Sequence, residues 1–209
     1  MYARARMDPH LKLWLQKWRW YERNSLPWRR ARIHLHAMRG GFFVRWPVQG
    51  NVLEALDDGR LVIGEQSLLE PNCWITISEH GRVTIGEGTF LNMGTMVACE
   101  NEVTIGDHVM LANGCFVSDA SHRYDDRSMP VTWQGFTSKG PTRIGSNTWF
   151  GVNCVVTTGV TVGERCVIGA NSVVTRDLPD GVIAAGAPAK VVREIEFTGE
   201  GGVAPGVAR

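Results

Sequence analysis

One histidine in this 209-residue chain stands where it can do acid–base chemistry. His122 lies in the stretch SDASHRYDDRSMP, residues 118–130, which interrupts an otherwise regular sequence. An imidazole titrates near neutral pH, so it can take a proton from a hydroxyl and return one to a departing thiolate. The sequence therefore predicts His122 as a catalytic general base; the alternative is that it only hydrogen-bonds within its own loop.

Asp119 precedes His122 by three residues, and two roles are open to it. Its carboxylate can orient the imidazole through a hydrogen bond and raise its basicity, or it can cap the loop. The loop insertion covers residues 118–143 and includes Trp133 and Phe136 among its charges. A loop of this length in a compact domain is usually functional. We expect it to be ordered, because disordered segments are poor in aromatic residues.

The elements that must position this loop repeat every six residues. After the loop, large apolar residues occupy the first position of each block: Ile144, Phe150, Val156, Val162, Ile168 and Val174. Before it, triples keep the same step: Ile63, Leu69, Ile75; Ile85, Leu91, Val97; Ile105, Leu111, Val117. Six is not a helical period, and a parallel solenoid explains it better than an open sheet. Each block is predicted to be one short strand and a turn, with small residues at positions two and five fitting the corners and glycine supplying positive φ.

Composition agrees with such a fold. Four of the five cysteines, Cys73, Cys115, Cys154 and Cys166, stand at position five, which indicates small buried residues; Cys99 is off that register. Without CxxC pairs, neither a disulfide framework nor a zinc site is expected. Residues 1–39 carry ten Lys/Arg against Asp8 and Glu22, so the remainder is acidic in a chain of net charge +1.

Three strings carry a family resemblance. The run IGSNTWFGVNCVVTTGVTVGERCVIGANSVV to VVREI, with FVSDASH and TFLNMG upstream, resembles the hexapeptide-repeat acyltransferases, especially the maltose/galactoside acetyltransferase and polysaccharide O-acetyltransferase branches. The resemblance covers residues 63–195 approximately. It implies an all-β solenoid, a left-handed parallel β-helix of about five coils with an N-terminal helical segment and an extended catalytic loop. The hand rests on the resemblance alone, because about 98% of parallel crossovers are right-handed.

The resemblance also implies site residues and partners. Asn92 is implied to bind the acceptor, although an Asn in a solenoid turn is the plainer alternative. The implied coenzyme A groove comprises Trp149 on the pantetheine arm, Gly151 and Val152, then Ala170, Thr175 and Arg176 along the channel, and Lys190 and Arg193 facing the phosphates. A backbone N–H near Gly151 or Val152 is our candidate oxyanion donor. Acetyl-CoA or another acyl-CoA is the expected co-substrate, no metal is expected, and the assembly is expected to be a homotrimer with sites between subunits.

The chain is expected to divide into three parts: a basic Trp-rich capping segment at 1–50, the acyltransferase solenoid at 51–195 and a flexible tail at 196–209. A helix bearing Leu11, Trp14, Leu15 and Trp18 on one stripe is predicted to end at Pro27. It can cap the solenoid or lie on a membrane surface. No secretory or spanning segment is evident, so we expect a cytoplasmic protein, with peripheral membrane contact through residues 1–39 left open. No nucleic-acid-reading motif accompanies the basic patch.

These features predict an acyl-CoA-dependent O-acyltransferase that acetylates a sugar or glycan hydroxyl by direct attack. Three alternatives remain: an N-acetyltransferase acting on an amino sugar or small amine, a γ-type carbonic anhydrase and a non-catalytic solenoid scaffold. The anhydrase is disfavoured because His80, His108 and His122 lack the spacing of a three-histidine zinc site. The identity of the acceptor and the length of the acyl chain stay open.

Overall fold

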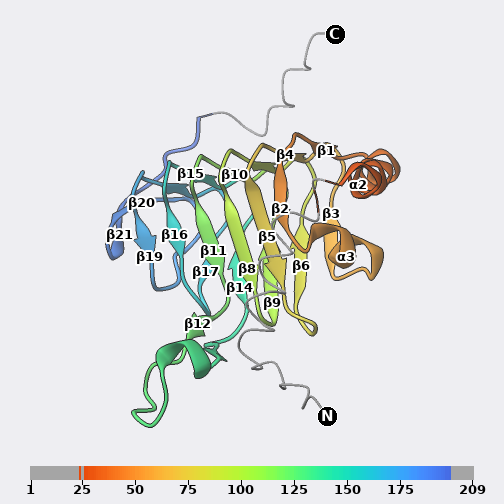
Figure 1. Ribbon diagram of the computed structural model, residues 1–209. Helices are drawn as coiled ribbons and strands as arrows, with labels where there is room; N and C mark the ends of the chain where they lie inside the picture. The colour runs from red at the N-terminus through yellow and green to blue at the C-terminus, as the bar shows by residue number, and fades with distance from the viewer. Residues whose placement is uncertain (1–23, 25, 199–209) are drawn as a thin grey trace.

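The computed structural model describes residue 24 and residues 26–198 as a parallel β-solenoid of about six turns (Figure 1). The predicted solenoid is confirmed. The number of turns exceeds the expected five because strand pairing begins at Phe43, well before the first apolar triple at Ile63. The predicted boundary at residue 51 therefore falls inside the first turn.

Three sheets form the three walls of the solenoid. Sheet A contains β1 (Phe43–Val44), β4 (Leu68–Leu69), β7 (Phe90–Leu91), β10 (Met110–Leu111), β15 (Trp149–Phe150), β18 (Val167–Ile168), β20 (Val182–Gly186) and β21 (Ala189–Glu194). Sheet B contains β2 (Val48–Gly50), β5 (Cys73–Ile77), β8 (Met96–Cys99), β11 (Phe116–Ser118), β16 (Val155–Val156) and β19 (Val173–Val174). Sheet C contains β3 (Leu61–Ile63), β6 (Arg82–Ile85), β9 (Glu102–Ile105), β14 (Thr142–Ile144) and β17 (Thr161–Val162).

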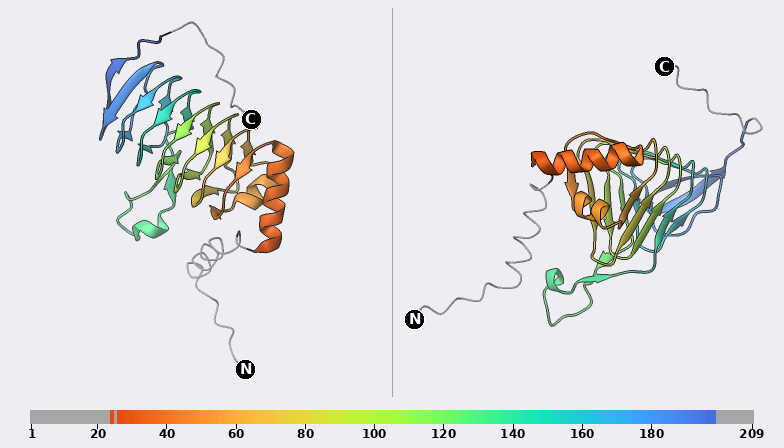
Figure 2. Two further views of the ribbon diagram at one scale, coloured as in Figure 1. Left: turned by 90° about the horizontal axis from the view of Figure 1, so that it is seen from above. Right: turned by 90° about the vertical axis from the view of Figure 1, so that its right-hand side faces the viewer.

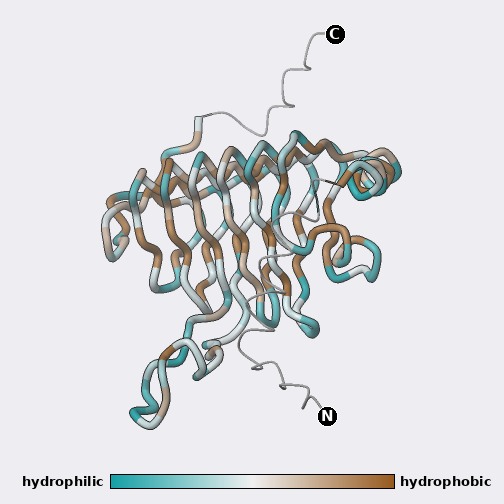
Figure 3. The backbone as a smooth tube through the Cα atoms, in the orientation of Figure 1, coloured by the Kyte–Doolittle hydropathy of each residue, from teal (hydrophilic) through white to brown (hydrophobic). Residues whose placement is uncertain are grey.

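The apolar column predicted from position one forms the core. Every position-one residue from Ile144 to Val174 is buried, and Phe150 is fully so. Apolar segments recur at the same place in turn after turn, while the loop between β11 and β14 is largely hydrophilic (Figure 3). Each fully buried side chain of this size contributes about 1.5–3 kcal/mol relative to exposure. The column therefore supplies the main stabilisation of the solenoid.

The corner residues correct one detail of the sequence prediction. Positive φ occurs at position four of the blocks, at Gln66, Asn72, Gly88, Gly94, His108, Gly114, Asn147, Asn153, Gly159, Arg165 and Asn171. Position-two glycines such as Gly145 do not have it. A Cβ on Gly145 would lie 2.5 Å from the backbone nitrogen of Glu164 in the next turn. Glycine at position two is thus required for close stacking of turns, and the expected reason, positive φ, is wrong.

Position five carries small residues that bond to the next turn. The Sγ of Cys73 lies 3.3 Å from the carbonyl oxygen of Leu91, and the hydroxyl of Ser67 donates to the carbonyl of Gly86 at 2.7 Å. All five cysteines are free and buried. Their interpretation as small core residues is confirmed, and Cys99 shares it.

Two helices cover the N-terminal end of the solenoid (Figure 2). Helix α2 (Pro27–Gly40) buries Arg29, Ile33 and Ala37, and α3 (Val52–Asp57) follows β2. Arg29 and Glu54 join the two helices through an ion pair of 2.7 Å. Pro27 begins α2, because its fixed φ and missing N–H suit the first turn of a helix. The predicted stripe of Leu11, Trp14, Leu15 and Trp18 lies outside the described residues.

The opposite end is closed by the antiparallel pair β20 and β21. After β21 the chain is described as far as residue 198, where Phe197 is exposed and faces the Arg165 guanidinium at 6.0 Å. Most of the tail predicted at 196–209 lies outside the described residues.

Candidate active site

His122 lies on a hairpin that projects from the corner between sheets B and C (Figure 1). Strand β12 (Ser121–His122) pairs with β13 (Phe136–Thr137), and the 3₁₀ turn η1 (Val131–Trp133) lies between them. His122 stands directly opposite Phe136, with ring centroids 4.6 Å apart at 37°. The imidazole is exposed. The loop therefore presents an accessible imidazole beside an aromatic ring.

Asp119 fastens the root of this hairpin. Its buried carboxylate accepts backbone N–H bonds of 2.7 Å from Glu100, Asn101 and Glu102 in the preceding turn. Its carbonyl oxygen accepts the hydroxyl of Ser138 at 2.6 Å. Both carboxylate oxygens are thus engaged away from His122, and no hydrogen bond joins the two side chains among the described residues. This geometry favours the capping alternative for Asp119 over an orienting role.

The side chain of Gln134 forms hydrogen bonds across the outer part of the loop. The amide of Gln134 accepts from the N–H of Asp126 at 2.9 Å and donates to the carbonyls of Asp126 and Met129 at 2.8 and 3.1 Å. At the inner end, the N–H of Lys139 donates to the Thr158 hydroxyl at 2.9 Å. The loop is therefore a folded unit tied to the solenoid at its base.

A groove of about 550 Å³ lies between the hairpin and the outer face of sheet B. Large side chains on its walls are Trp74, Met96, Phe116 and Phe136. Its ionisable groups are His122, the Glu100 carboxylate and the Cys99 thiol. A mostly apolar groove with few polar groups is typical of small-molecule sites.

The Cys99 thiol is not activated. Burial and the nearby charge of Asp119 raise the pKa of Cys99 to about 12. A thiol with that pKa stays protonated at neutral pH, and the thiolate is the reactive form. Cys99 is therefore a poor nucleophile, although it lines the groove.

The predicted acceptor residue Asn92 lies elsewhere, at the corner between sheets A and B. Its amide donates to the carbonyl of Leu111 at 2.8 Å, as a turn residue does. Sheet B separates this corner from the one that carries His122. One chain alone does not bring Asn92 and His122 to the same groove.

The candidate oxyanion donors share the corner of Asn92. The N–H of Gly151 donates to the carbonyl of Ile168 at 2.8 Å, so it is not free to bind an oxyanion. No backbone bond from the N–H of Val152 occurs among the described residues. Val152 is also exposed, which makes it the remaining candidate.

The residues implied to bind coenzyme A are spread over two corners and one end. Trp149 points outward from sheet A, half exposed, and Ala170 is exposed at the corner between sheets A and B. Thr175 and Arg176 are exposed at the other edge of sheet B, and Lys190 and Arg193 are exposed on the terminal strand β21.

The sequence analysis missed the groove walls on sheet B. Trp74, Met96 and Phe116 pair in register across adjacent strands and face outward. Each immediately precedes a buried position-one residue, so all three stand at position six. Apolar residues at position six were the available signal, because that position points out of the solenoid.

The described residues contain no cluster of three or more His, Cys, Asp or Glu side chains that could hold a metal ion. Neither helix in the described part has the length and hydropathy of a membrane span.

Comparison with curated proteins gives two extended relatives. A probable acetyltransferase of Mycobacterium tuberculosis is 37% identical over 147 residues, 67% of this chain and 49% of that protein. The galactoside O-acetyltransferase of Escherichia coli is 35% identical over 133 residues, 64% of this chain and 63% of that protein. The chain thus spans between half and two thirds of the length of these relatives. Residues 141–176 also match the family described as the hexapeptide repeat of succinyl-transferase.

The similarity to solved structures covers a larger share of the chains compared. A maltose O-acetyltransferase from Clostridium difficile is 31% identical with a TM-score of 0.56, over 69% of this chain and 75% of that one. A galactoside acetyltransferase in complex with coenzyme A is 32% identical with a TM-score of 0.54, over 69% and 70%. A hexapeptide-repeat acetyltransferase from Vibrio cholerae, complexed with acetyl coenzyme A, is 26% identical with a TM-score of 0.61, over 91% and 92%.

Proposed function

The chain belongs to the hexapeptide-repeat acetyltransferases, and we propose that it transfers an acetyl group from acetyl-CoA to a hydroxyl of a sugar or glycan. The observation that carries the proposal is the place of His122, exposed on a folded hairpin that opens onto a groove of about 550 Å³. An imidazole in such a place has access both to an acceptor and to a thioester.

The reaction needs one proton carrier. His122 takes the proton of the acceptor hydroxyl while the acceptor oxygen bonds to the thioester carbonyl carbon. The tetrahedral intermediate then expels the coenzyme A sulfur, and the imidazolium returns the proton to that sulfur. The products are the O-acetyl ester and coenzyme A. Such acid–base work contributes about 10²–10⁴-fold to rate.

The contacts of the groove favour direct attack over a covalent acyl-enzyme. The Cys99 thiol is a poor nucleophile, because its pKa of about 12 keeps it protonated. Three serines also line the groove, Ser78, Ser118 and Ser121, but among the described residues none of their hydroxyls has a hydrogen bond to His122 that would activate it.

The lining of the groove supports a neutral ring-shaped acceptor. Its walls are aromatic and aliphatic, and no Lys or Arg lines it within the described part of the chain. Glu100 supports a second acceptor class, because a carboxylate on the groove suits the ammonium group of an amino sugar. N-acetylation is therefore the second candidate activity.

Exposed groups of the right chemistry support coenzyme A binding. Trp149 and Val152 offer apolar surface for the pantetheine arm, and Arg176, Lys190 and Arg193 offer cations for the phosphates. A lysine at 190 gives a point charge in place of the two-pronged contact of arginine.

A homotrimer with sites between subunits completes the proposal. Val152 and His122 belong to opposite edges of sheet B, so a site that uses both needs a neighbouring chain. The outward position-six residues support this assembly. They are apolar on sheet A, at Phe90, Met110, Trp149 and Val167, and on sheet B, at Trp74, Met96, Phe116 and Val155. On sheet C only Val62 is apolar, and Thr84, Thr104, Arg143 and Thr161 are polar. Three-fold rotation can bring sheet A of one chain towards sheet B of the next and leave sheet C in water, and the groove on sheet B then lies between two chains.

A cytoplasmic location belongs to the same proposal and is supported by the five free cysteines, which suit a reducing compartment. Peripheral membrane contact through residues 1–39 is also proposed, and helix α2 is the described part of that segment.

The proposal is tested by thiol release from acetyl-CoA over a panel of sugars, glycans and amino sugars. We expect His122→Ala to lower kcat/KM at least a hundredfold, because proton transfer is lost. It should still bind acetyl-CoA, seen as a thermal shift at saturating ligand. His80→Ala is the matched control, since His80 is exposed outside the groove.

Retention of more than a hundredth of the activity by His122→Ala would remove the histidine from the mechanism. Release of thiol with no acceptor on the panel would contradict acyl transfer to this class. Glu100→Gln separates the two candidate activities, because it should weaken amino acceptors and spare neutral ones.

A further inference from the structure

Helix α2 has a second apolar stripe, on the side opposite the solenoid. The buried residues Arg29, Ile33 and Ala37 recur every four positions and mark the inner face. Trp28, Ala31, Leu35 and Met38 recur at steps of three and four and mark one outer face. All four are exposed, Trp28 by 54% and Met38 by 75%. A helix that only capped the solenoid would need apolar residues on its inner side alone.

Cations flank this stripe. The sequence has no Asp or Glu from Asn24 to Leu53, but it has five arginines there. Arg30 stacks on the Trp46 ring at 4.7 Å, and Arg39 has no ion-pair partner among the described residues. Arg32 pairs with Asp57 at 2.8 Å, yet its side chain stays half exposed. The outer face of α2 is therefore apolar along its middle and positive at its margins.

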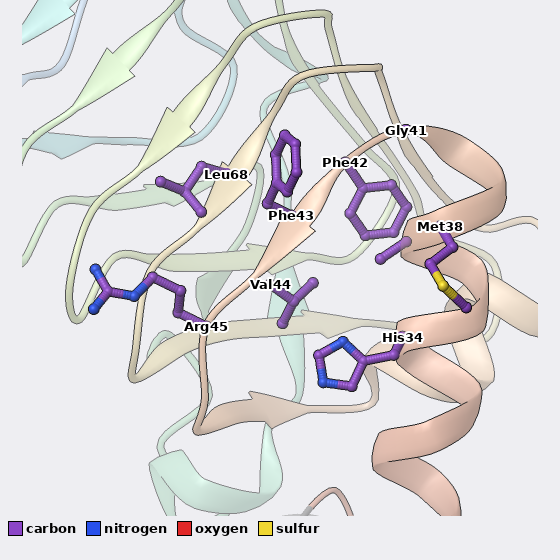
Figure 4. Close-up of a pocket in the computed structure, with 9 residues that line it drawn as sticks. His34, Met38, Gly41, Phe42, Phe43, Val44, Arg45 and Leu68 are labelled. Atoms are coloured by element: carbon purple, nitrogen blue, oxygen red, sulfur yellow. The ribbon is translucent and has the colours of Figure 1, made fainter. Parts of the chain in front are cut away.

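An apolar groove adjoins the stripe at Met38. Figure 4 shows it between α2 and strand β1, with Met38 on the helix side and Phe42 and Val44 on the strand side. It has a volume of about 580 Å³, and His34 and Arg45 are the basic groups of its lining. Arg45 pairs with Glu70 at 3.1 Å, and the Nε2 of His34 accepts the Trp46 indole N–H at 2.7 Å. The groove therefore extends the apolar surface beyond the helix, and the positive charge of this face comes from the arginines of α2.

We propose that the outer face of α2, the stripe of Trp28, Leu35 and Met38 with Arg30 and Arg39, docks the protein on an anionic lipid surface. Apolar side chains of such a helix enter the boundary between headgroups and acyl chains, and flanking arginines meet the anionic headgroups. A tryptophan suits this boundary because its ring is amphipathic. Charge complementarity distinguishes this partner from a neutral surface. This inference rests on the peripheral membrane contact proposed above, to which it adds the helix face and the lipid class, and it is independent of the acetyltransferase reaction.

The test is flotation of the full chain with vesicles of phosphatidylcholine mixed with phosphatidylglycerol, and with phosphatidylcholine alone. We expect flotation with the anionic vesicles and its decline as salt is raised. The double variant Leu35→Glu with Met38→Glu should lower the vesicle-bound fraction about tenfold or more, since charges enter the stripe. The matched control is Val191→Glu with Val192→Glu, which changes two exposed apolar residues at the other end of the solenoid.

Two outcomes overturn the proposal. The first is wild-type protein that ignores anionic vesicles, and the second is equal flotation of the Leu35/Met38 variant and the wild type. If the wild type does not float and the variant loses its assembly in sedimentation velocity, the stripe is a contact between copies. Wild-type thermal stability of both double variants shows that they fold.

Discussion

At the scale of single residues, the position of His122 depends on the hydrogen bonds at the base of its hairpin. Asp119 accepts three backbone N–H bonds at 2.7 Å from the turn below and lies fully buried. Hydrogen bonds to a charged acceptor are stronger than neutral ones, and a buried carboxylate is stable only when it is paired in this way. The place of His122 thus depends on a residue that does not contact its ring.

We predict that Asp119→Asn lowers the free energy of unfolding by about 2–4 kcal/mol, because the amide nitrogen faces N–H donors and the charge-assisted bonds are lost. Urea denaturation measures this change. The pH profile of kcat should keep its shape in the folded variant. Asp125→Asn, an exposed carboxylate on the same loop, should leave the unfolding midpoint in place. A shifted pH profile with unchanged stability would instead assign Asp119 the orienting role.

A buried thiol gives a pH-dependent prediction. Burial raises the pKa of Cys73 from 9.0 to about 12. Above pH 9 the unfolded thiol loses its proton while the folded one keeps it, so stability present below pH 9 is lost progressively up to about pH 12. The slope is about 1.4 kcal/mol per pH unit for each such thiol.

Cys73→Ser should therefore show a shallower loss of stability than wild type between pH 9 and 11, measured by urea denaturation. Serine is the matched replacement because Ser172 occupies position five of a later turn and donates to the carbonyl of Gly169 at 2.6 Å. If the free energy of unfolding falls with pH at the same slope in both proteins, the fold does not raise the pKa of Cys73.

At the scale of elements, each six-residue block has two separate backbone requirements. Position four needs positive φ, which Asn and Gly tolerate best. Position two needs the absence of a Cβ, because the next turn lies against it. The first requirement is conformational and local, whereas the second depends on contact between turns.

We predict different costs for two Gly→Ala changes. Gly145→Ala should lower the free energy of unfolding by about 3 kcal/mol, since its Cβ would lie 2.5 Å from backbone atoms of the next turn. Gly59→Ala should cost about 1 kcal/mol, because φ is +75° there but nothing lies within 4 Å of a Cβ. Thermal unfolding measures both; equal costs would mean that turn spacing relaxes freely.

At the scale of the whole molecule, two walls of the solenoid carry outward apolar rows, and the third is polar outside except at Val62. Outward apolar rows along sheets A and B exceed what an isolated soluble prism needs. In the proposed trimer with parallel solenoid axes, the three copies of α2 lie at one end of the assembly. Three docking helices on one end would bind a lipid surface together, which strengthens weak single contacts.

The assembly predicts the effect of one charge on sheet A. Met110→Glu places a carboxylate among outward apolar neighbours Phe90 and Trp149, and it should convert a particle of three 23.1 kDa chains into monomers in sedimentation equilibrium. Thr104→Glu, on the polar wall of sheet C, is the control and should leave the mass unchanged. A trimer that survives Met110→Glu would place the interface elsewhere.

Residue types and spacing alone predicted the six-residue repeat, the buried column from Ile144 to Val174 and His122 as an acid–base group. These features are periodic or local, so residue type and spacing are sufficient to predict them. The helix that begins at Pro27 was not predicted, because the basic residues after Pro27 interrupt its apolar pattern and proline was interpreted only as a helix end. Position-two glycine was explained by the wrong cause, because contact between turns is not visible in one block.

The contacts between side chains of different turns could not be predicted from the sequence and follow from the tertiary structure. The Asp119 carboxylate accepts hydrogen bonds from the preceding turn, and the Gly151 N–H donates to the carbonyl of Ile168 in the next one. Asn92 and His122 lie at opposite edges of sheet B. The tertiary structure also forms the groove of Trp74, Met96 and Phe116 from three turns of the chain. The physical reason is that winding brings residues about 20 positions apart into register, and hydrogen bonds are then satisfied between turns rather than along the sequence.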